Sequence, residues 1–266
     1  METENKNCAV VTGASLGIGR AIAGGLASRG YDLVLNSLSG QGLPDFCHEL
    51  ESKYKIRAFC AEGDLTEEDG PGKLFGFAEE KRLRVNMLVN NAGIGYEGPV
   101  EGYSKKQIDH MLLLNVRATT LLTVLFLPEL KMHEKSYILN LGSFGGYLPT
   151  AYKSIYLATK SYVFYFTRAL ESELNGSTVK TCVATPSAVR TNANTIGRIE
   201  RNGWFSRSSA LSPEEVAEEV LSGMFKGKKV ILPGRLSRLF FRVGSFVPEG
   251  IMLWLTRRIF RNYQQG

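Results

Sequence analysis

Residues that commonly hold metal ions are few and scattered in this chain. Its 266 residues include only four cysteines and three histidines, and their spacing matches no zinc-binding pattern. A metal centre is therefore not expected. Cys8, Cys60 and Cys182 lie in predicted strands, and we interpret them as small apolar residues of the core. The other four residues of this set are Cys47, His48, His110 and His133.

Long apolar runs and low-complexity tracts are also missing. No apolar stretch reaches the ~18 residues that a membrane-spanning helix needs. The first residues, Met1 to Lys6, are polar and do not form a secretory signal, so we expect an intracellular, cytoplasmic protein. No internal repeat or linker divides the chain. An apolar content of 44% is enough for the core of one large domain over residues 1–266.

Acidic residues are scarce in the last part of the chain. Residues 226–266 hold nine lysines and arginines but one acid, Glu249, which gives this segment a charge of +8 against −2 for residues 1–225. Aromatic and aliphatic side chains lie between the basic ones, as in segments that bind a membrane surface. The apolar content is too high for an arm that contacts only phosphates, so no nucleic-acid partner is expected. Packing against the domain or a sister subunit is the alternative.

Apolar segments of strand length alternate with helical patterns along the chain. Seven strands are predicted, at residues 8–12, 31–35, 56–61, 86–89, 136–141, 178–184 and 229–232. Such alternation indicates an α/β protein of the doubly wound Rossmann type, in which a seven-stranded parallel sheet has helices on both faces. Ligands of such proteins bind at the carboxyl ends of the strands.

A glycine-rich turn follows the first predicted strand. Gly13, Gly17 and Gly19 stand between that strand and a helical pattern that includes Arg20. Glycine lets the backbone approach a pyrophosphate, and a helix start offers free N–H groups and a positive dipole. Strand, glycine turn and helix together predict a dinucleotide site, although the spacing G-x-x-x-G-x-G differs from the commoner G-x-G-x-x-G. A tight turn without a ligand is the alternative.

Tyr156 and Lys160 stand four residues apart, on one face of a predicted helix. A free tyrosine titrates near pH ~10 and is a poor acid or base at neutral pH. An ammonium group one turn away favours the phenolate and lowers the pKa of a tyrosine. The pair can therefore move a proton to or from a substrate oxygen. The spacing alone is weak evidence, because such pairs also occur on solvated helix faces.

Further motifs follow in a fixed order, and together they resemble the short-chain dehydrogenase/reductase family, in its T-G-x-x-x-G-x-G and Y-x-x-x-K subgroup. The resemblance covers about residues 7–233. Within the family, the chain is similar to ketoacyl and hydroxysteroid reductases. The resemblance implies a hydride moved between a nicotinamide cofactor and a carbonyl or alcohol carbon. The motifs are Thr12 to Gly19, Asp64-Leu65, Asn90-Asn91-Ala92-Gly93, Asn115, Ser143, Tyr156 to Lys160, and Pro186 to Thr191.

The resemblance also implies roles for individual side chains. Tyr156 is implied to be the general acid in reduction and the base in oxidation. Lys160 is implied to lower the pKa of that tyrosine and to bond the nicotinamide ribose. Ser143 is implied to hold the substrate carbonyl, and Asn115 to interrupt a helix and carry a water. The cofactor residues implied besides Tyr156 and Lys160 are Gly13, Ser15, Gly17, Ile18, Gly19, Arg20, Asn36, Ser37, Asp64, Leu65, Asn90, Asn91, Ala92, Gly93, Pro186, Ser187, Val189 and Thr191.

The end of the second predicted strand bears on the choice of cofactor. Family members that bind NAD carry an acid there, on the adenosine ribose, whereas this chain has Asn36 and Ser37. Without a carboxylate to repel a 2′-phosphate, NADP(H) is favoured over NAD(H). The basic residue that many NADP-binding relatives carry is missing, and Leu16 stands at one of those positions. Arg20 either contacts the phosphate or is a surface arginine.

Substrate contacts are expected from two segments. Between the serine and the tyrosine, Tyr147, Leu148 and Tyr152 are the candidate walls of the pocket. A lid is expected over residues 192–210, followed beyond the core by the basic extension 234–266. Within the lid, three apolar residues either face a substrate or pack onto the domain: Ile199, Trp204 and Phe205.

Two positions depart from the usual family pattern. Ser187 replaces a glycine that shapes the backbone near the nicotinamide, and Gly142 replaces a serine, as in several members that act on steroids and other lipids. We interpret neither change as a loss of activity. Family members commonly pair through the helices that carry Asn115 and Tyr156, so a homodimer or homotetramer is expected.

The leading hypothesis is an NADP(H)-dependent reduction of a ketone to a secondary alcohol, or the reverse, on a hydrophobic substrate. A 3-ketoacyl compound or another keto-lipid is favoured, and a hydroxysteroid is the second choice. A nucleotide-binding scaffold without turnover is an alternative of a different class. Peripheral contact with a membrane through the extension is compatible with each of these.

Overall fold

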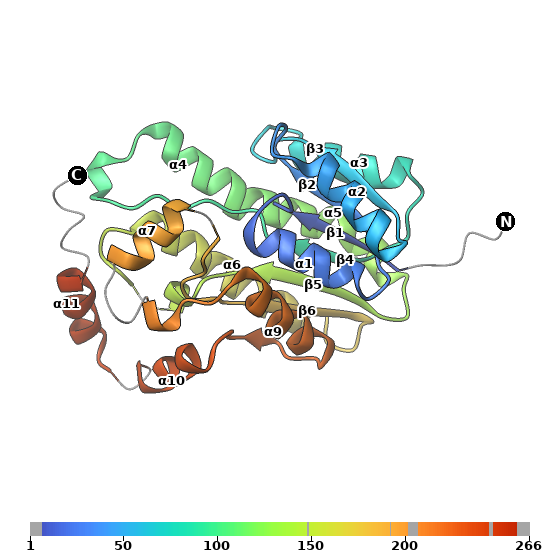
Figure 1. The fold of residues 1–266 in the computed structure, drawn as a ribbon. Coiled ribbons are helices and arrows are strands. Elements are labelled where there is room, and N and C mark those ends of the chain that lie inside the picture. Colours follow the sequence, from blue (N-terminus) through green and yellow to red (C-terminus); the bar gives the residue numbers. More distant parts are fainter. Residues whose placement is uncertain (1–6, 148, 192, 202–206, 245–246, 260–266) are drawn as a thin grey trace.

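A seven-stranded parallel sheet forms the centre of the protein (Figure 1). The computed structural model describes residues 7–147, 149–191, 193–201, 207–244 and 247–259. The strand order is β3-β2-β1-β4-β5-β6-β7 with all neighbours parallel, which confirms the predicted Rossmann-type fold. The strands are β1 (Cys8–Thr12), β2 (Asp32–Ser37), β3 (Ala58–Glu62), β4 (Val85–Asn90), β5 (Ser136–Leu141), β6 (Val179–Ala184) and β7 (Val230–Ile231).

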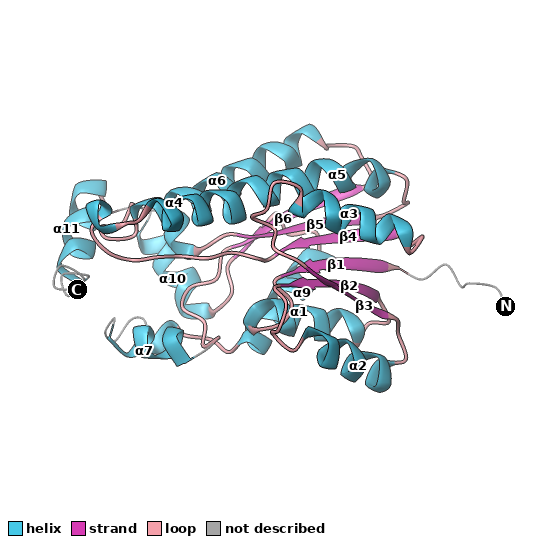
Figure 2. Cartoon of the chain, turned by 90° about the horizontal axis from the view of Figure 1, so that it is seen from above, coloured by secondary structure: helices cyan, strands magenta, loops and turns pink. Residues whose placement is uncertain are grey.

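Helices cover both faces of the sheet (Figure 2). In β1, Ala9 and Val11 pack into the core on one face, and Cys8 and Val10 pack into the core on the other. Because both faces are covered, the strand is apolar throughout and does not alternate with polar residues. One layer contains α1 (Gly17–Ala27), α2 (Leu43–Tyr54) and α9 (Pro213–Phe225); the other contains α3 (Gly70–Glu80), α5 (Thr119–Lys131) and α6 (Ser154–Glu173).

The strand order reverses at β1, which places the predicted motifs together. From β1 the chain winds outward to β2 and β3, and then returns to β4 on the other side of β1. In this architecture ligands bind outside the carboxyl ends of the strands next to such a reversal. The glycine turn follows β1 and the asparagine motif follows β4, so both lie at this carboxyl edge of the sheet.

One long helix contains a π-helical turn. α4 (Lys105–Leu112) continues into the π segment η2 (Leu113–Ala118) and then into α5. By length and composition this helix, Lys105–Lys131, is the one candidate membrane span among the described helices, a test that the core helix of a globular domain also passes. Here α5 packs on β4 and α3 inside the domain, so its placement is that of a core helix.

Several short elements lie beyond the carboxyl edge. They include α7, α10 and α11, so the C-terminal extension lies at the same end of the molecule as the predicted site (Figure 1). The bounds are η1 (Val100–Gly102), η3 (Phe144–Tyr147), α7 (Ala193–Arg201), α10 (Arg235–Gly244) and α11 (Glu249–Ile259).

The cysteines follow the prediction in part. Cys8 and Cys182 are free and buried in β1 and β6, as expected of small core residues. Cys60 of β3 instead forms a disulfide with Cys47 of α2, with Cα atoms 6.5 Å apart. The sequence spacing gave no sign of this pair, because α2 brings the two residues together only after it packs on the sheet.

Candidate active site

The glycine turn joins β1 to the start of α1. Gly13 has φ 64° and Gly17 has φ 55°, left-handed backbone conformations that favour glycine. At Gly19 a Cβ atom would collide with the carbonyl oxygen of Gly13 and the side chain of Asn91. The backbone thus passes close to the first turn of α1, where N–H groups are free to bind an anion. This cradle fits the pyrophosphate of a dinucleotide.

Asn91 braces this turn from the neighbouring strand. Its Nδ2 donates to Thr12 O at 2.9 Å and to Gly13 O at 3.1 Å. The backbone N–H groups of Asn91 and Ala92 both donate to Thr12 Oγ1 at 3.0 Å. The amide of Asn91 therefore holds the ends of β1 and β4 together. Thr12, which begins the glycine motif, is thus a further site residue, for which the motif alone predicted no role.

Polar side chains at the end of β2 also bond inside the protein. Asn36 is buried, and its Nδ2 donates to Ala61 O at 2.9 Å and to Gly63 O at 3.2 Å. Ser37 Oγ donates to Leu38 O at 3.0 Å. Asn36 thus joins β2 to the end of β3, and its amide donors are not directed at a cofactor phosphate.

Arg20 and Ser15 make contacts with the segment around α2. Arg20 Nη2 lies 2.8 Å from Glu49 Oε2, and its guanidinium carbon lies 3.7 Å from the ring centroid of Phe46. Ser15 Oγ donates to Gln41 Oε1 at 2.7 Å. Arg20 therefore links α1 to α2 at the protein surface, and a contact of Arg20 with a cofactor phosphate stays a prediction.

Asn115 lies in the π segment, so the predicted interruption of a helix is present. Its Oδ1 accepts from the backbone N–H of Ile94 at 2.9 Å, and its Nδ2 donates to Ile94 O at 2.8 Å and to Thr159 Oγ1 at 2.9 Å. These bonds satisfy a buried amide among apolar neighbours. They tie the long helix to the loop after β4 and to α6.

The ammonium group of Lys160 is buried beside this loop, with the residue 6% exposed. Its Nζ donates to Leu141 O at 2.7 Å. Gly93 leaves the space, since a Cβ there would stand 3.0 Å from Nζ and 3.1 Å from Asn115 Oδ1. Burial lowers the pKa of Lys160 to about 8. A lysine with this pKa can exchange a proton near neutral pH.

Tyr156 lies one helical turn before Lys160 on α6, against the same loop. A Cβ at Gly95 would stand 2.6 Å from Cδ2 of the tyrosine ring, so glycine makes room for the ring. Both side chains therefore approach the segment after β4, at the carboxyl edge of the sheet. Ser143 follows β5 at this edge and is half-buried. No motif in the sequence marks Gly95 as a site residue.

The loop after β6 lies between the two halves of the site. Phe144 N donates to Pro186 O at 2.9 Å, which joins this loop to the residue after Ser143. Further along, Thr191 lies against the glycine turn, because a Cβ at Gly17 would stand 2.8 Å from Thr191 Cγ2. The structure thus brings the first and last motifs of the sequence side by side.

The remaining predicted cofactor residues lie at the carboxyl edge or just below it. Asp64 Oδ1 accepts from the backbone N–H and from Oγ1 of Thr66, both at 2.8 Å. Asn90 Nδ2 donates to Asn140 Oδ1 at 2.9 Å, a buried bond between β4 and β5. Leu65 and Val189 are buried, whereas Ile18 is partly buried on α1.

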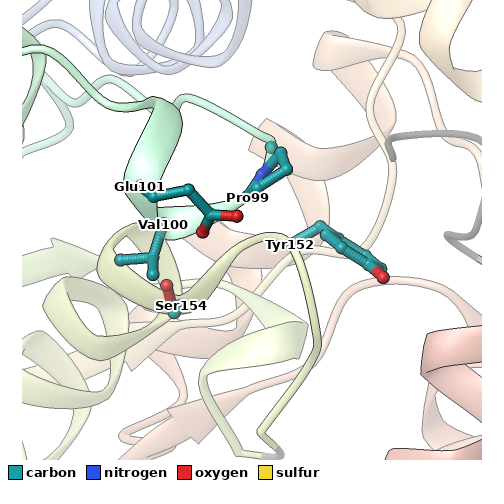
Figure 3. A pocket seen from close by; sticks show the side chains of 6 residues that line it. Pro99, Val100, Glu101, Tyr152 and Ser154 are labelled. Carbon is teal, nitrogen blue, oxygen red and sulfur yellow. The ribbon is translucent and has the colours of Figure 1, made fainter. Parts of the chain in front are cut away.

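A pocket of about 570 Å³ opens beside the start of α6 (Figure 3). Tyr152, a predicted wall residue, lies on it with φ 64°, and its carbonyl oxygen accepts from Gly98 N at 2.8 Å. This volume is within the range of small-molecule sites, and Tyr156 lies two residues after the lining residue Ser154 on α6. The pocket is lined by Gly98, Pro99, Val100, Glu101, Tyr152 and Ser154.

Tyr147, the other predicted wall residue, does not line this pocket. Its ring packs on Phe164 of α6 and Phe241 of α10, with both centroid distances 4.7 Å. Its hydroxyl lies 3.0 Å from Thr185 Oγ1, and burial raises the pKa of Tyr147. The ring of Tyr147 therefore packs between α6 and α10. In the predicted lid, Ile199 is buried. Trp204 and Phe205 of the lid and the predicted wall residue Leu148 lie outside the described residues.

Comparisons with known proteins identify the family and the fold of this chain. The model of the short chain dehydrogenase family matches residues 7–200. A very-long-chain 3-oxoacyl-CoA reductase-A of Danio rerio is 36% identical over 170 residues, 62% of this chain and 52% of that protein. This chain therefore spans about half the length of that curated relative.

Two solved structures show the shared fold. A short-chain dehydrogenase from Sphingobium yanoikuyae in complex with NADPH is 28% identical, with a TM-score of 0.75 over 93% of this chain and 95% of that one. A short chain dehydrogenase/reductase from Burkholderia phymatum in complex with NAD is 24% identical, with a TM-score of 0.81 over 95% and 96%.

The buried charge of Lys160 predicts how stability depends on pH. The folded pKa is about 8 and the reference value is 10.5, so burial of the charged form costs stability below pH 8. We expect Lys160→Met to be roughly 2 kcal/mol more stable than the natural chain at pH 7. The difference should shrink from pH 8 to 10.5, where the folded lysine has lost its proton and the unfolded one retains it.

Urea unfolding at a series of pH values measures this difference. Lys106→Met, at an exposed position of α4, is the control and should show no such pH dependence. A stability difference for Lys160→Met that stays constant from pH 7 to 10 would contradict a buried, titrating ammonium group.

Proposed function

This chain belongs to the short-chain dehydrogenase family, and we propose that it is an NADP(H)-dependent oxidoreductase that interconverts a ketone and a secondary alcohol on a hydrophobic substrate. The observation that carries the proposal is the buried Lys160 ammonium, one helical turn from Tyr156 and against the same loop. Burial of a charge costs stability, and a solvated Tyr/Lys pair on a helix surface would not incur that cost. A role in proton transfer accounts for it.

The residues act on the proton while the cofactor, when bound, supplies or accepts the hydride. In reduction, Tyr156 donates its phenolic proton to the carbonyl oxygen as the carbon gains the hydride, so that a C–H and an O–H bond form. Lys160 stabilises the phenolate that remains. Ser143 donates a hydrogen bond to the same oxygen, and Asn115 holds the helix against the loop after β4. In oxidation these proton steps run in reverse.

NADP(H) is favoured because no carboxylate stands at the end of β2, where Asn36 and Ser37 are found. One similar structure holds NADPH and the other holds NAD, so likeness alone does not select the cofactor. The Arg20–Glu49 ion pair is exposed on both sides, and such a pair contributes less than about 1 kcal/mol. Arg20 can therefore turn from Glu49 to a 2′-phosphate at little cost.

A 3-ketoacyl compound or a related keto-lipid is the substrate class that we favour. The likeness to the 3-oxoacyl-CoA reductase of Danio rerio supports this choice. The pocket at the start of α6 is lined both by apolar residues, Pro99 and Val100, and by polar ones, among them Glu101 and Ser154. A hydroxysteroid is the second choice. Its reacting group is carried on a rigid fused-ring system, whereas that of a 3-ketoacyl compound is carried on a flexible chain.

A homodimer is expected through α5 and α6. Val124 of α5 and Tyr165 of α6 are exposed large apolar residues. Tyr162 stacks on Phe166, and its hydroxyl lies 2.9 Å from Thr120 Oγ1 across the two helices. This face carries apolar surface that a second copy would cover by two-fold symmetry, and a homotetramer would require a second interface.

The C-terminal extension is expected to contact an anionic membrane surface. Leu239 of α10 and Trp254 of α11 are 57% and 58% exposed, and exposed arginines stand around them. Apolar side chains of such helices enter the lipid, and basic ones bind the headgroups. The extension lies at the end of the molecule that holds the site (Figure 1), which suits a substrate taken from a bilayer. The exposed arginines are Arg235, Arg238, Arg242, Arg257 and Arg258.

Tyr156→Phe is expected to lower turnover at least ~100-fold, because it removes the proton donor, while NADPH still binds. Absorbance of NADPH measures turnover on panels of acyl, steroid and small ketones, and fluorescence titration measures binding. Tyr54→Phe, on α2 and distant from the site, is the matched control. Normal turnover by Tyr156→Phe would refute the assignment. If the natural chain binds NADPH but reduces no ketone of any panel, the scaffold alternative is favoured.

Side-by-side titration is expected to show tighter binding of NADPH than of NADH. Arg20→Gln should lower the ratio of the NADPH affinity to the NADH affinity at least about fivefold, because the variant has no guanidinium group to bind the 2′-phosphate. Glu49→Gln is the control: it frees Arg20 and should preserve or increase the preference. If NADH binds more tightly to the natural chain, the argument from the end of β2 is wrong.

Sedimentation with vesicles tests the membrane contact. The full chain should bind vesicles that contain phosphatidylserine and lose this binding in high salt. Replacing Arg242, Arg257 and Arg258 by glutamine should weaken binding by about tenfold or more, at roughly 1 kcal/mol per charge.

A charge-matched control keeps this vesicle test specific. Replacing Lys53, Lys55 and Lys81, which are exposed on other parts of the domain, removes the same charge and should leave binding almost unchanged. Equal losses of vesicle binding in both triple variants would show that binding depends on net charge alone and not on the extension. No binding of the natural chain at low salt would end the membrane proposal.

A further inference from the structure

Three serines from distant parts of the chain meet where the C-terminal extension begins. Ser237 Oγ donates to Ser187 Oγ at 2.9 Å, and Ser187 Oγ donates to the backbone oxygen of Ser209 at 3.1 Å. Ser237 is 0% exposed. A short series of hydrogen bonds therefore links α10 to the loop after β6 and to the segment that precedes α9.

Ser237 faces inward from a helix whose neighbouring residues face outward. Arg235, Arg238, Leu239 and Phe240 of α10 are all exposed. A fully buried hydroxyl needs a hydrogen-bond partner, and Ser187 supplies it. The first turn of α10 is thus fastened to the loop after β6 by a polar contact.

This first turn is held in place from α9. Glu219 of α9 accepts from the backbone N–H of Gly234, at 3.3 Å and 3.2 Å to its two oxygens. Arg238 Nη1 lies 2.6 Å from the same carboxylate and donates to Leu232 O at 2.9 Å. Because α9 packs on α1 in the layer that carries the glycine turn, Ser237 has a fixed position relative to that turn.

The loop that contains Ser187 reaches the glycine turn four residues later. Val189 forms a parallel bridge with Leu211, and Arg190 N donates to Leu211 O at 3.0 Å. Thr191 then lies against Gly17, with 2.8 Å between its Cγ2 and a Cβ built on that glycine. A displacement of Ser187 is therefore passed to a residue in contact with the dinucleotide cradle.

We propose that Ser237 is a positioning residue for the cofactor: through Ser187 it fixes the loop of residues 186–191 against the glycine turn. The C-terminal extension is thereby part of the machinery that holds the dinucleotide. This inference rests on the proposed function in one respect, that the ligand of the glycine turn is a dinucleotide. The usual family residue at position 187 is glycine, which has no hydroxyl group to accept a hydrogen bond from Ser237. In this chain the two serines therefore act as a pair.

Ser237→Ala tests the proposal in the full chain. We expect the Kd for NADPH, measured by fluorescence titration, to rise about tenfold, as for the loss of one buried hydrogen bond. The kcat at saturating NADPH should stay within about twofold. Amide hydrogen exchange of residues 187–191, measured without cofactor, should become faster. Arg235→Gln, at an exposed neighbour on the same turn, should change none of these.

Ser187→Gly gives an independent test, because it removes the partner hydroxyl and leaves the packing of α10 intact. It should reproduce the changes of Ser237→Ala, and the double variant should bind NADPH no more weakly than either single variant. Unchanged affinity and unchanged exchange in both single variants would overturn the proposal. Additive losses in the double variant would also overturn it.

These readouts separate the proposal from the proposed activity. If the natural chain binds NADPH and reduces no ketone, the activity assignment fails, while the coupling between the two serines is still measured by binding and exchange. If exchange becomes faster but the affinity for NADPH and NADH is unchanged, the serine contact is only structural and the positioning role is refuted.

Discussion

The burial of the Lys160 side chain constrains the geometry of the rest of the site. Burial of the Lys160 ammonium lowers its pKa to about 8, and Leu141 O accepts a hydrogen bond from it. A buried charge persists only where the surroundings hold it with good geometry. The end of β5, the loop after β4 and the first half of α6 must therefore keep their relative positions. Gly93 is part of this constraint, because a side chain there would occupy the space of Nζ.

Three side chains from two helices converge on one short loop. Asn115 bonds both backbone groups of Ile94, Lys160 fills the space beside Gly93, and the ring of Tyr156 fills the space beside Gly95. The π segment matters here, because an extra residue in a helical turn changes the direction of the side chains that follow. Asn115 can then face the loop while α5 still packs on β4. The π turn, the glycines and the buried lysine thus form one arrangement.

The sequence predicted the elements better than it predicted the partners of polar side chains. Strands buried on both faces are apolar, so β1 and β5 have the predicted bounds, whereas β2 runs on to Ser37 because it continues to pair with β3. The amides of Asn36 and Asn91 bond carbonyl oxygens far away in the sequence. Position in a motif does not distinguish a hydrogen-bond donor that braces a turn from one that binds a phosphate. The sequence also gives no sign that Phe241 of α10 packs on Tyr147.

The charge pattern of the C-terminal extension fitted two interpretations, contact with a membrane surface and packing on the domain, and the structure shows why. Ser237 is buried and the ring of Phe241 contacts Tyr147, whereas Leu239 is largely exposed. A helix packed along one edge presents its opposite edge outward, so packing on the domain and contact with a lipid surface do not exclude each other. If lipid contact moves Ser237, it changes the affinity for the dinucleotide. By linkage the dinucleotide then changes the affinity for lipid by the same factor, because both ligands act on the position of one helix.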